Sequence, residues 1–200
     1  MSMEAEFYRA NVAEAIDRRL LYHAALAVQV AQVESRGFPD LELDAVPPLR
    51  RLNFNSALLF GTYPGGATVA RASHSGGAHV AVLSGGVTIT SLTRSRMPRS
   101  VEFQPYQETL ATEGQLGLFG DEEGDRTHDK LFGLFIYGGD YRSPRLTLCR
   151  MTFPTPKGFF APGTLDLLGM YPEVVEPFND EEYAQRQVVE FLQMRNARRV

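Results

Sequence analysis

"GGATVARASHSGGAHVAVLSGGVTITSL", residues 65–92, decides the fold of this 200-residue chain. Runs of strand-forming residues alternate here with Gly-Gly pairs. Glycine adopts the positive φ angles that tight hairpin turns require, without a steric penalty. The stretch therefore predicts three consecutive antiparallel strands, "ATVARAS", "AHVAVLS" and "VTITSL".

Further strands are expected on both sides of this stretch. Downstream, the segments 130–138 ("KLFGLFIYG") and 145–153 ("RLTLCRMTF") are rich in residues typical of strands, and 164–171 ("TLDLLGMY") is a short last candidate. Upstream, the segment 53–63 is either a first strand or the end of a helix. The sequence therefore predicts a mostly antiparallel sheet of about six strands within residues 53–170.

Helical patterns lie at both ends of the chain. In residues 4–36, apolar side chains recur at steps of three and four, which predicts a long N-terminal helix, with a break near residues 20–22 as the alternative. The recurring positions are Val12, Ile16, Leu20, His23, Ala27 and Val30. In residues 179–198, early acidic and late basic residues after a cap at Asn179 or Asp180 suit the dipole of a C-terminal helix. The predicted fold class is α+β, with helices covering one face of the sheet.

Prolines mark the segment between the first helix and the sheet. Residues 38–51, "FPDLELDAVPPLRR", contain Pro39, Pro47 and Pro48. Proline lacks the N–H donor that a helix interior needs, and it disfavours a helical conformation of the residue before it. An extended connector is therefore expected here.

The composition is that of one folded domain over residues 1–200, with 44% hydrophobic and 22% charged residues. The sequence lacks an apolar run of membrane-span length, and its first residues lack the apolar segment of a signal peptide. A single cysteine, Cys149, excludes an internal disulfide. A cytoplasmic protein without membrane contact is expected. A net charge of −4 argues against nucleic-acid binding over the whole surface but leaves room for a local basic patch.

The best candidate for such a patch follows the third predicted strand, in "TRSRMPRS". Arg94, Arg96 and Arg99, joined by Arg50 and Arg51, are candidates for contacting DNA phosphates. The planar guanidinium group matches phosphate oxygens, and clustering raises the local positive potential. The alternative is that these side chains are the solvated end of a strand.

The common catalytic motifs are absent from the sequence, and no cofactor is predicted. Cys149 lies in the middle of a predicted strand, where a buried thiol is expected rather than a nucleophile. His74 and His79 flank a hairpin turn, where two neutral imidazoles could bind a metal together with a carboxylate such as Asp140 or Asp166. The alternative is that both are surface residues of a hairpin.

Apolar residues stand out in the polar, acidic segment 104–130, which is expected to be an exposed loop. Within "GQLGLFGDEEGD" (114–125) lie Leu116, Leu118 and Phe119, outside any helical or strand pattern. Such residues either bind a partner or fold back onto the core or onto a second copy of the chain.

The five residues 115–119, "QLGLF", resemble the Gln-Leu-x-Leu-Phe motif by which bacterial replication and repair proteins bind the DNA polymerase sliding clamp. The resemblance implies that the Gln115 amide bonds the rim of a clamp pocket, that Leu118 and Phe119 fill it, and that Leu116 packs beside it. Each buried side chain contributes about 1.5–3 kcal/mol, largely offset by ordering of the loop, so micromolar affinity is expected. Gly117 departs from the serine or aspartate commoner at this position and should weaken binding.

The leading hypothesis is a non-enzymatic accessory or regulatory protein of bacterial or phage DNA metabolism, tethered to the sliding clamp through residues 115–119. The first rival is a metal-dependent enzyme with its site around the 74–79 hairpin. The second is an interaction or inhibitor module, or a homo-oligomer, that uses the same loop.

Overall fold

A computed structural model describes residues 2–12, 14–63, 67–74, 77–84, 86–105, 107–109, 111–112, 131–160 and 163–198, with residues 70–74 and 77–84 given by their backbone alone. The helices are α1 (Met3–Asn11), α2 (Glu14–Ser35), α3 (Glu42–Phe60), α5 (Leu167–Met170), α6 (Pro172–Val175), the 3-10 helix η1 (Glu176–Asn179) and α7 (Glu181–Ala197). The strands are β1 (Thr68–His74), β2 (Gly77–Ser84), β3 (Val87–Arg94), β4 (Leu131–Gly138), β5 (Leu148–Thr152) and β6 (Leu165–Asp166). In this part of the chain, none of the helices combines the length and the apolar character needed to cross a membrane.

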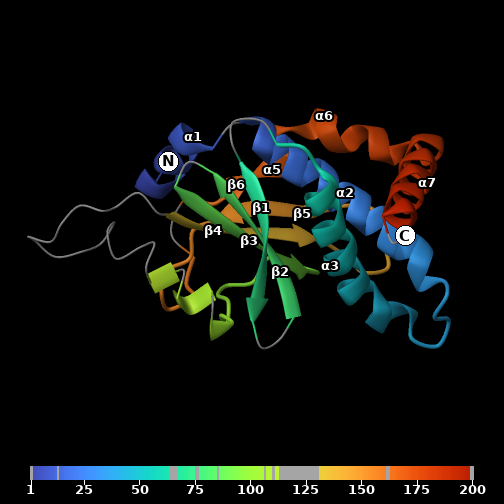
Figure 1. Cartoon of the computed structure of the whole chain (residues 1–200), viewed down its shortest axis with the longest axis horizontal. Helices are drawn as coiled ribbons and strands as arrows, with labels where there is room; N and C mark the ends of the chain where they lie inside the picture. Colours follow the sequence, from blue (N-terminus) through green and yellow to red (C-terminus); the bar gives the residue numbers. More distant parts are fainter. Residues whose placement is uncertain are drawn as a thin grey trace, which may run out of the picture.

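The sheet is mixed, with strands in the order β1-β2-β3-β4-β5-β6 (Figure 1). The α+β class is confirmed, and β1, β2 and β3 form the antiparallel meander that the glycine pairs predict. The next pairing is parallel, with Val87 opposite Leu131 and Arg94 opposite Gly138. The prediction of a mostly antiparallel sheet of about six strands is therefore not confirmed. A parallel neighbour requires a crossover connection, and the chain between residues 95 and 130 supplies it.

The expected helix over residues 4–36 is two helices, because the backbone at Val12 is extended, with φ −116° and ψ 124°. The bend brings α1 against the first turn of α2. There the Tyr8 hydroxyl donates to Asp17 Oδ1, and Arg9 Nη1 lies 2.9 Å from Asp17 Oδ2. Tyr171, which follows α5, donates to the same carboxylate at 3.3 Å. Asp17 is buried, and these donors offset the loss of its hydration.

The expected connector over residues 38–51 is wrong, because α3 runs through Pro47 and Pro48. The carbonyl groups that these prolines leave without a helical donor belong to Leu43 and Asp44, which are exposed to water. Further along the helix, Phe54 is fully buried in the core. Packing of this face stabilises the helix more than the prolines destabilise it. The segment 53–63 therefore contains the end of a helix and not a first strand, which agrees with the second of the two interpretations of its sequence.

At the other end of the chain, the short strand expected over residues 164–171 is limited to Leu165–Asp166. The Asp166 side chain then caps α5 by accepting from Gly169 N. The predicted C-terminal helix is present as α7, capped by the Asp180 side chain, which accepts from Tyr183 N at 2.8 Å.

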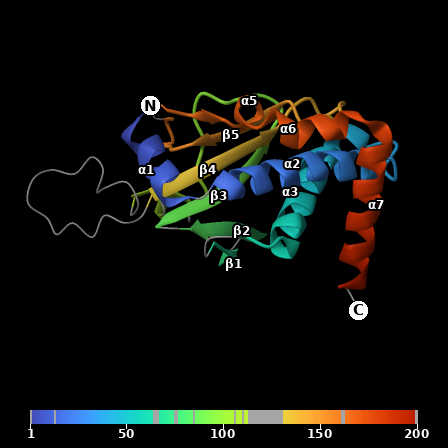
Figure 2. The same ribbon diagram turned by 90° about the horizontal axis from the view of Figure 1, so that it is seen from above.

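The helices α2 and α3 lie side by side across one face of the sheet, with α7 beyond them (Figure 2). The main core forms between α1, α2, α3 and the sheet. Its largest buried side chains include Tyr8, Ile16, Leu20, Phe54, Phe135, Tyr137 and Phe153. A second core joins α2 and α3 to α7, where Val188 and Phe191 pack on Leu26. On the opposite face of the sheet, a third cluster contains Val101, Leu134, Ile136 and Leu148. Because both of its faces are covered, β4 is buried along its whole length.

Hydrogen bonds of Arg50 connect α3 to the turn after β4. Its side chain is fully buried, and its guanidinium donates to the carbonyl oxygens of Gly139 (3.0 Å), Asp140 (3.0 Å) and Ser143 (2.8 Å). The Tyr137 hydroxyl in turn donates to the backbone oxygen of Arg50 at 3.1 Å. The guanidinium group thus supplies hydrogen bonds to three carbonyl oxygens that would otherwise have to be bonded by water.

We expect Arg50→Ala to lower the free energy of unfolding by about 3 kcal/mol or more, because it leaves the carbonyl oxygen of buried Gly139 without its donor, removes the bonds to two further carbonyls and opens a cavity. Urea denaturation followed by circular dichroism measures the change. Arg51→Ala is the matched control, since Arg51 is the exposed neighbour on the same helix, and its effect should stay within about 0.5 kcal/mol. Equal stabilities for the two variants would contradict a structural role for Arg50.

Candidate functional site

The exposed basic side chains Arg94, Arg96 and Arg99 lie on the loop that leaves β3 (the arginine loop, residues 94–99). The loop encloses a hollow of about 550 Å³. Its first residue is fixed by the hydrogen bond from Gly139 N to Arg94 O (2.9 Å), and the chain beyond it is fixed by the bond from Val101 N to Gly158 O (2.9 Å). The structure therefore brings the three arginines together on a loop held at both ends.

The charges of the arginine loop are available to an outside anion. In the described residues, none of the three guanidinium groups forms a salt bridge with a carboxylate. Arg94 Nη1 donates to the backbone oxygen of Thr93 at 3.0 Å, which leaves its charge uncompensated. Unpaired guanidinium groups on one loop attract phosphate or carboxylate groups.

Arg50 does not belong to this group, contrary to the sequence-based expectation. It is buried and engaged with backbone carbonyls, and burial lowers the pKa of its guanidinium. Arg51 is exposed on α3 and does not line the hollow of the arginine loop. The sequence places Arg50 and Arg51 side by side, but on a helix adjacent residues face different surroundings.

The rival metal site is not assembled by the described residues. The backbone places His74 opposite Gly77 and His79 opposite Ala72, while both histidine side chains lie outside the described part. Asp166 is on β6, four strand spacings from β2, or on the order of 19 Å. Its carboxylate accepts from Arg150 Nη2 at 3.2 Å.

Asp140, the other candidate carboxylate, accepts from the backbone N–H of Arg142 at 2.9 Å. Among the described side chains, no group of three histidine, cysteine, aspartate or glutamate residues could hold a metal. Cys149 is buried as expected, and burial raises the pKa of its thiol, which disfavours the reactive thiolate.

The segment 104–130 is not an exposed loop in its first part. Gln107 is buried, its amide nitrogen donates to Thr90 Oγ1 at 3.2 Å, and Ala111 is fully buried. The hydrogen bond to Thr90 on β3 and the burial of Gln107 and Ala111 hold this part against the sheet. The partner-binding candidates lie outside the described residues; they are Gln115, Leu116, Leu118 and Phe119.

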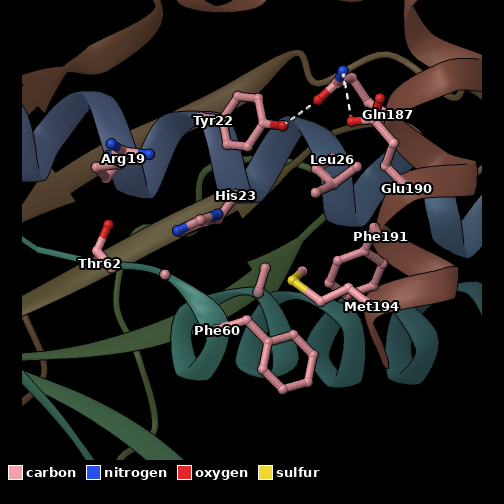
Figure 3. Close-up of a pocket in the computed structure, with 12 residues that line it drawn as sticks. Arg19, Tyr22, His23, Leu26, Phe60, Thr62, Gln187, Glu190, Phe191 and Met194 are labelled. Carbon is pink, nitrogen blue, oxygen red and sulfur yellow. Dashed lines mark hydrogen bonds between the residues drawn. The ribbon is translucent and has the colours of Figure 1, made fainter. Parts of the chain in front are cut away.

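A cavity between α2, the end of α3 and α7 was not anticipated from the sequence (Figure 3). Its volume is about 280 Å³. In Figure 3, Arg19, Thr62 and His23 lie at one end of the cavity, and the other, more apolar end also carries Gln187 and Glu190 of α7. The apolar end is lined by Leu26, Phe60, Phe191 and Met194. Between α2 and α7, the Tyr22 hydroxyl donates to Gln187 Oε1 at 2.5 Å.

His23 is the unusual residue of this cavity. It is 6% exposed, and neither ring nitrogen has a hydrogen-bond partner in the described structure. The Tyr63 hydroxyl is likewise buried and unpartnered. A Cβ atom added to Gly61 would lie 2.7 Å from His23 Nε2 and 3.0 Å from the Tyr63 hydroxyl oxygen. Both polar atoms therefore pack closely against Gly61, where a Cβ would collide with His23 Nε2.

Burial lowers the pKa of His23 to about 4, and the charge of Arg19 adds to this effect, so the imidazole is neutral at pH 7. In the sequence, His23 occupies a position of the apolar stripe of α2. This histidine in an otherwise apolar stripe was the only indication of the cavity in the sequence. Its convergence with Tyr63 depends on packing between α2 and the end of α3, which periodicity does not reveal.

The low pKa of His23 predicts that acid destabilises the fold. Unfolded histidine titrates near 6.5, so between about pH 6.5 and pH 4 the unfolded chain binds a proton that the folded chain does not. The stability contributed by neutral His23 is thus full above this window and falls by roughly 3 kcal/mol across it. Urea denaturation at about pH 7 and pH 4.5 should show a loss in the wild type that His23→Leu largely lacks. Parallel losses in both proteins would mean that His23 titrates normally.

Comparison with models of protein families, with curated proteins and with solved structures finds no match for this chain. Its function therefore has to be inferred from its own side chains. Two described features carry chemistry: the guanidinium groups of the arginine loop, which form no salt bridge with the described residues, and the unpartnered polar atoms of His23 and Tyr63.

Proposed function

We propose that this protein is a non-enzymatic accessory or regulatory protein of bacterial or phage DNA metabolism, tethered to the DNA polymerase sliding clamp through Gln115–Phe119. The observation that carries the proposal is the sequence "QLGLF" at residues 115–119. It supplies the glutamine and the pair of large apolar side chains that fill the clamp pocket in proteins with the Gln-Leu-x-Leu-Phe motif.

The position of the motif in the chain supports this proposal. On its N-terminal side, Ala111 is fully buried, and on its C-terminal side, Leu131 is 2% exposed at the start of β4. The segment between them is thus attached to the fold at both ends. Recognition of a short linear motif requires that a clamp bind it without disturbing the core, and the proposal makes this requirement of residues 115–119.

The arginine loop supports a second contact, with DNA. It precedes the motif within the same connection between β3 and β4, and its three guanidinium groups are exposed and free of carboxylate partners within the described residues. A protein held on a clamp is held beside the DNA that the clamp encircles, so a weak phosphate contact gains from a high effective concentration. This arrangement reconciles a net charge of −4 with DNA binding by a local patch.

We expect the purified protein to bind a bacterial sliding clamp with a Kd on the order of micromolar, measured by interferometry. Leu118→Ala/Phe119→Ala should weaken binding more than about 100-fold, because two apolar side chains no longer fill the pocket. Glu122→Ala/Glu123→Ala, a double substitution in the same segment, is the matched control and should bind as the wild type does. Gly117→Ser should tighten binding by about 2–5-fold, because serine has less conformational freedom to lose.

The tether proposal fails if clamp at tens of micromolar does not bind the wild type, or if the Leu118→Ala/Phe119→Ala variant binds equally well. If that variant instead alters the mass of the free protein in light scattering, the segment joins copies of this chain to one another.

The DNA contact has a separate test in the salt dependence of binding to duplex DNA. Each phosphate contact contributes about 0.9 to the slope of log K against log salt, so Arg94→Gln/Arg96→Gln/Arg99→Gln should reduce the slope by about 2.7. Control substitutions remove the same charge from exposed arginines elsewhere: Arg36→Gln/Arg142→Gln/Arg145→Gln. Equal slopes for the two variants would exclude the arginine loop as the DNA contact and leave the clamp proposal standing.

A further inference from the structure

We propose that the arginine loop and the segment that follows β5 form one binding surface for single-stranded DNA, with a base stacked on the ring of Phe159. The inference rests on the DNA contact proposed above and names the form of DNA that this contact takes. It does not depend on binding to the clamp.

The segment after β5 (the Phe159 turn, residues 154–160) presents an aromatic ring to solvent on a constrained backbone. Phe159 is 59% exposed. Its N–H donates to Thr155 Oγ1 at 3.2 Å, and its carbonyl oxygen accepts from Thr155 N at 2.6 Å. The next residue, Phe160, is half-buried against the cluster that contains Val101. Little conformational entropy is therefore lost when a ligand contacts the ring of Phe159.

The Phe159 turn is attached to the end of the arginine loop. Ser100, the residue after the loop, pairs with Phe159 in an antiparallel bridge, and Val101 N donates to Gly158 O at 2.9 Å. Gly158 permits this approach, since its φ is +78° and a Cβ there would collide with the carbonyl oxygen of Val101. Paired residues have their Cα atoms about 5 Å apart, which places the Cα of Phe159 within about 9 Å of that of Arg99.

Exposed cations lie on both segments. Lys157 is on the Phe159 turn, and the three guanidinium groups are on the arginine loop. Within the ranges that the structure describes, none of these four cations forms a salt bridge. The adjoining segments contribute two exposed carboxylates, Glu102 and Asp140, so positive charge prevails and favours the phosphates of a nucleic acid.

An aromatic ring beside cations suits a single strand better than a duplex. Proteins bind single strands by contacting phosphates with basic side chains while exposed bases stack on aromatic rings. In a duplex the faces of the bases are already stacked on one another, and only their edges are accessible in the grooves. Phe159 therefore adds a contact to a single strand that duplex DNA cannot make.

Fluorescence anisotropy of the full chain with a labelled oligothymidylate of about twelve nucleotides tests this inference, beside a duplex of the same length. We expect the single strand to bind several-fold more tightly than the duplex. Phe159→Ala should weaken binding of the single strand about tenfold, because stacking of one base is of this size, and should leave duplex binding unchanged. Phe38→Ala is the matched control, since it removes a phenylalanine that is 50% exposed in the turn between α2 and α3, and it should bind as the wild type does.

A spectroscopic variant locates the base. The chain contains no tryptophan, so Phe159→Trp introduces a single fluorescent reporter at an exposed position. This variant should bind oligothymidylate at least as tightly as the wild type, and its emission should be quenched when a base stacks on the indole. The emission of Phe38→Trp should stay unchanged on addition of the same oligonucleotide.

Equal effects of Phe159→Ala on both forms of DNA, or no effect on either, would overturn the stacking inference and leave the phosphate contact of the arginine loop standing. Tighter binding of oligouridylate than of oligothymidylate would overturn the assignment to DNA and make RNA the ligand. If neither form of DNA binds at tens of micromolar protein, the proposed DNA contact itself fails, and the inference fails with it.

Discussion

The parallel pairing of β3 with β4 is the constraint on which the rest of the structure depends. Two parallel strands cannot be joined by a tight turn, so the chain must return across the sheet before β4 can begin. That crossover supplies Val101 and Phe103 to the face of the sheet that the helices leave uncovered, and β4 is thereby buried on both sides. The same crossover carries the arginine loop and the "QLGLF" motif. The features proposed to bind DNA phosphates and the clamp therefore lie on the crossover connection that the parallel pairing of β3 with β4 requires.

The turns and helix ends that depend on residues close together in the chain could be predicted from the sequence. Glycine pairs specify the turns around β2 whatever packs against them, and Asp180 caps α7 through a bond to a residue three positions later. The failures came where tertiary contacts decide. Proline at positions 47 and 48 destabilises a helix locally, but burial of Phe54 on the same helix outweighs that effect. The bend at Val12 follows from polar contacts of α1 with Asp17, which no helical periodicity reports.

The candidate sites show the same difference between residues that are neighbours in the chain and residues that only packing brings together. Arg94, Arg96 and Arg99 could be grouped from the sequence because they are neighbours along the chain, and the structure keeps them together on one loop. Arg50 could not be separated from Arg51 without knowing which side of α3 faces the turn after β4. The approach of His23 on α2 to Tyr63, which follows α3, joins segments that are distant in sequence, so no spacing rule would find it.

The fold pairs some of its buried polar groups and leaves others without a partner among the described residues. Asp17 has three donors for its carboxylate, and Arg50 has three carbonyl acceptors, although its Nε atom has no partner among the described residues. His23 differs because neither of its ring nitrogens has a partner in the part of the chain that the structure describes. Leaving a buried polar group unpaired costs about 1–3 kcal/mol, a sizeable share of the stability of a single domain. Substituting an apolar residue for His23 would remove that cost.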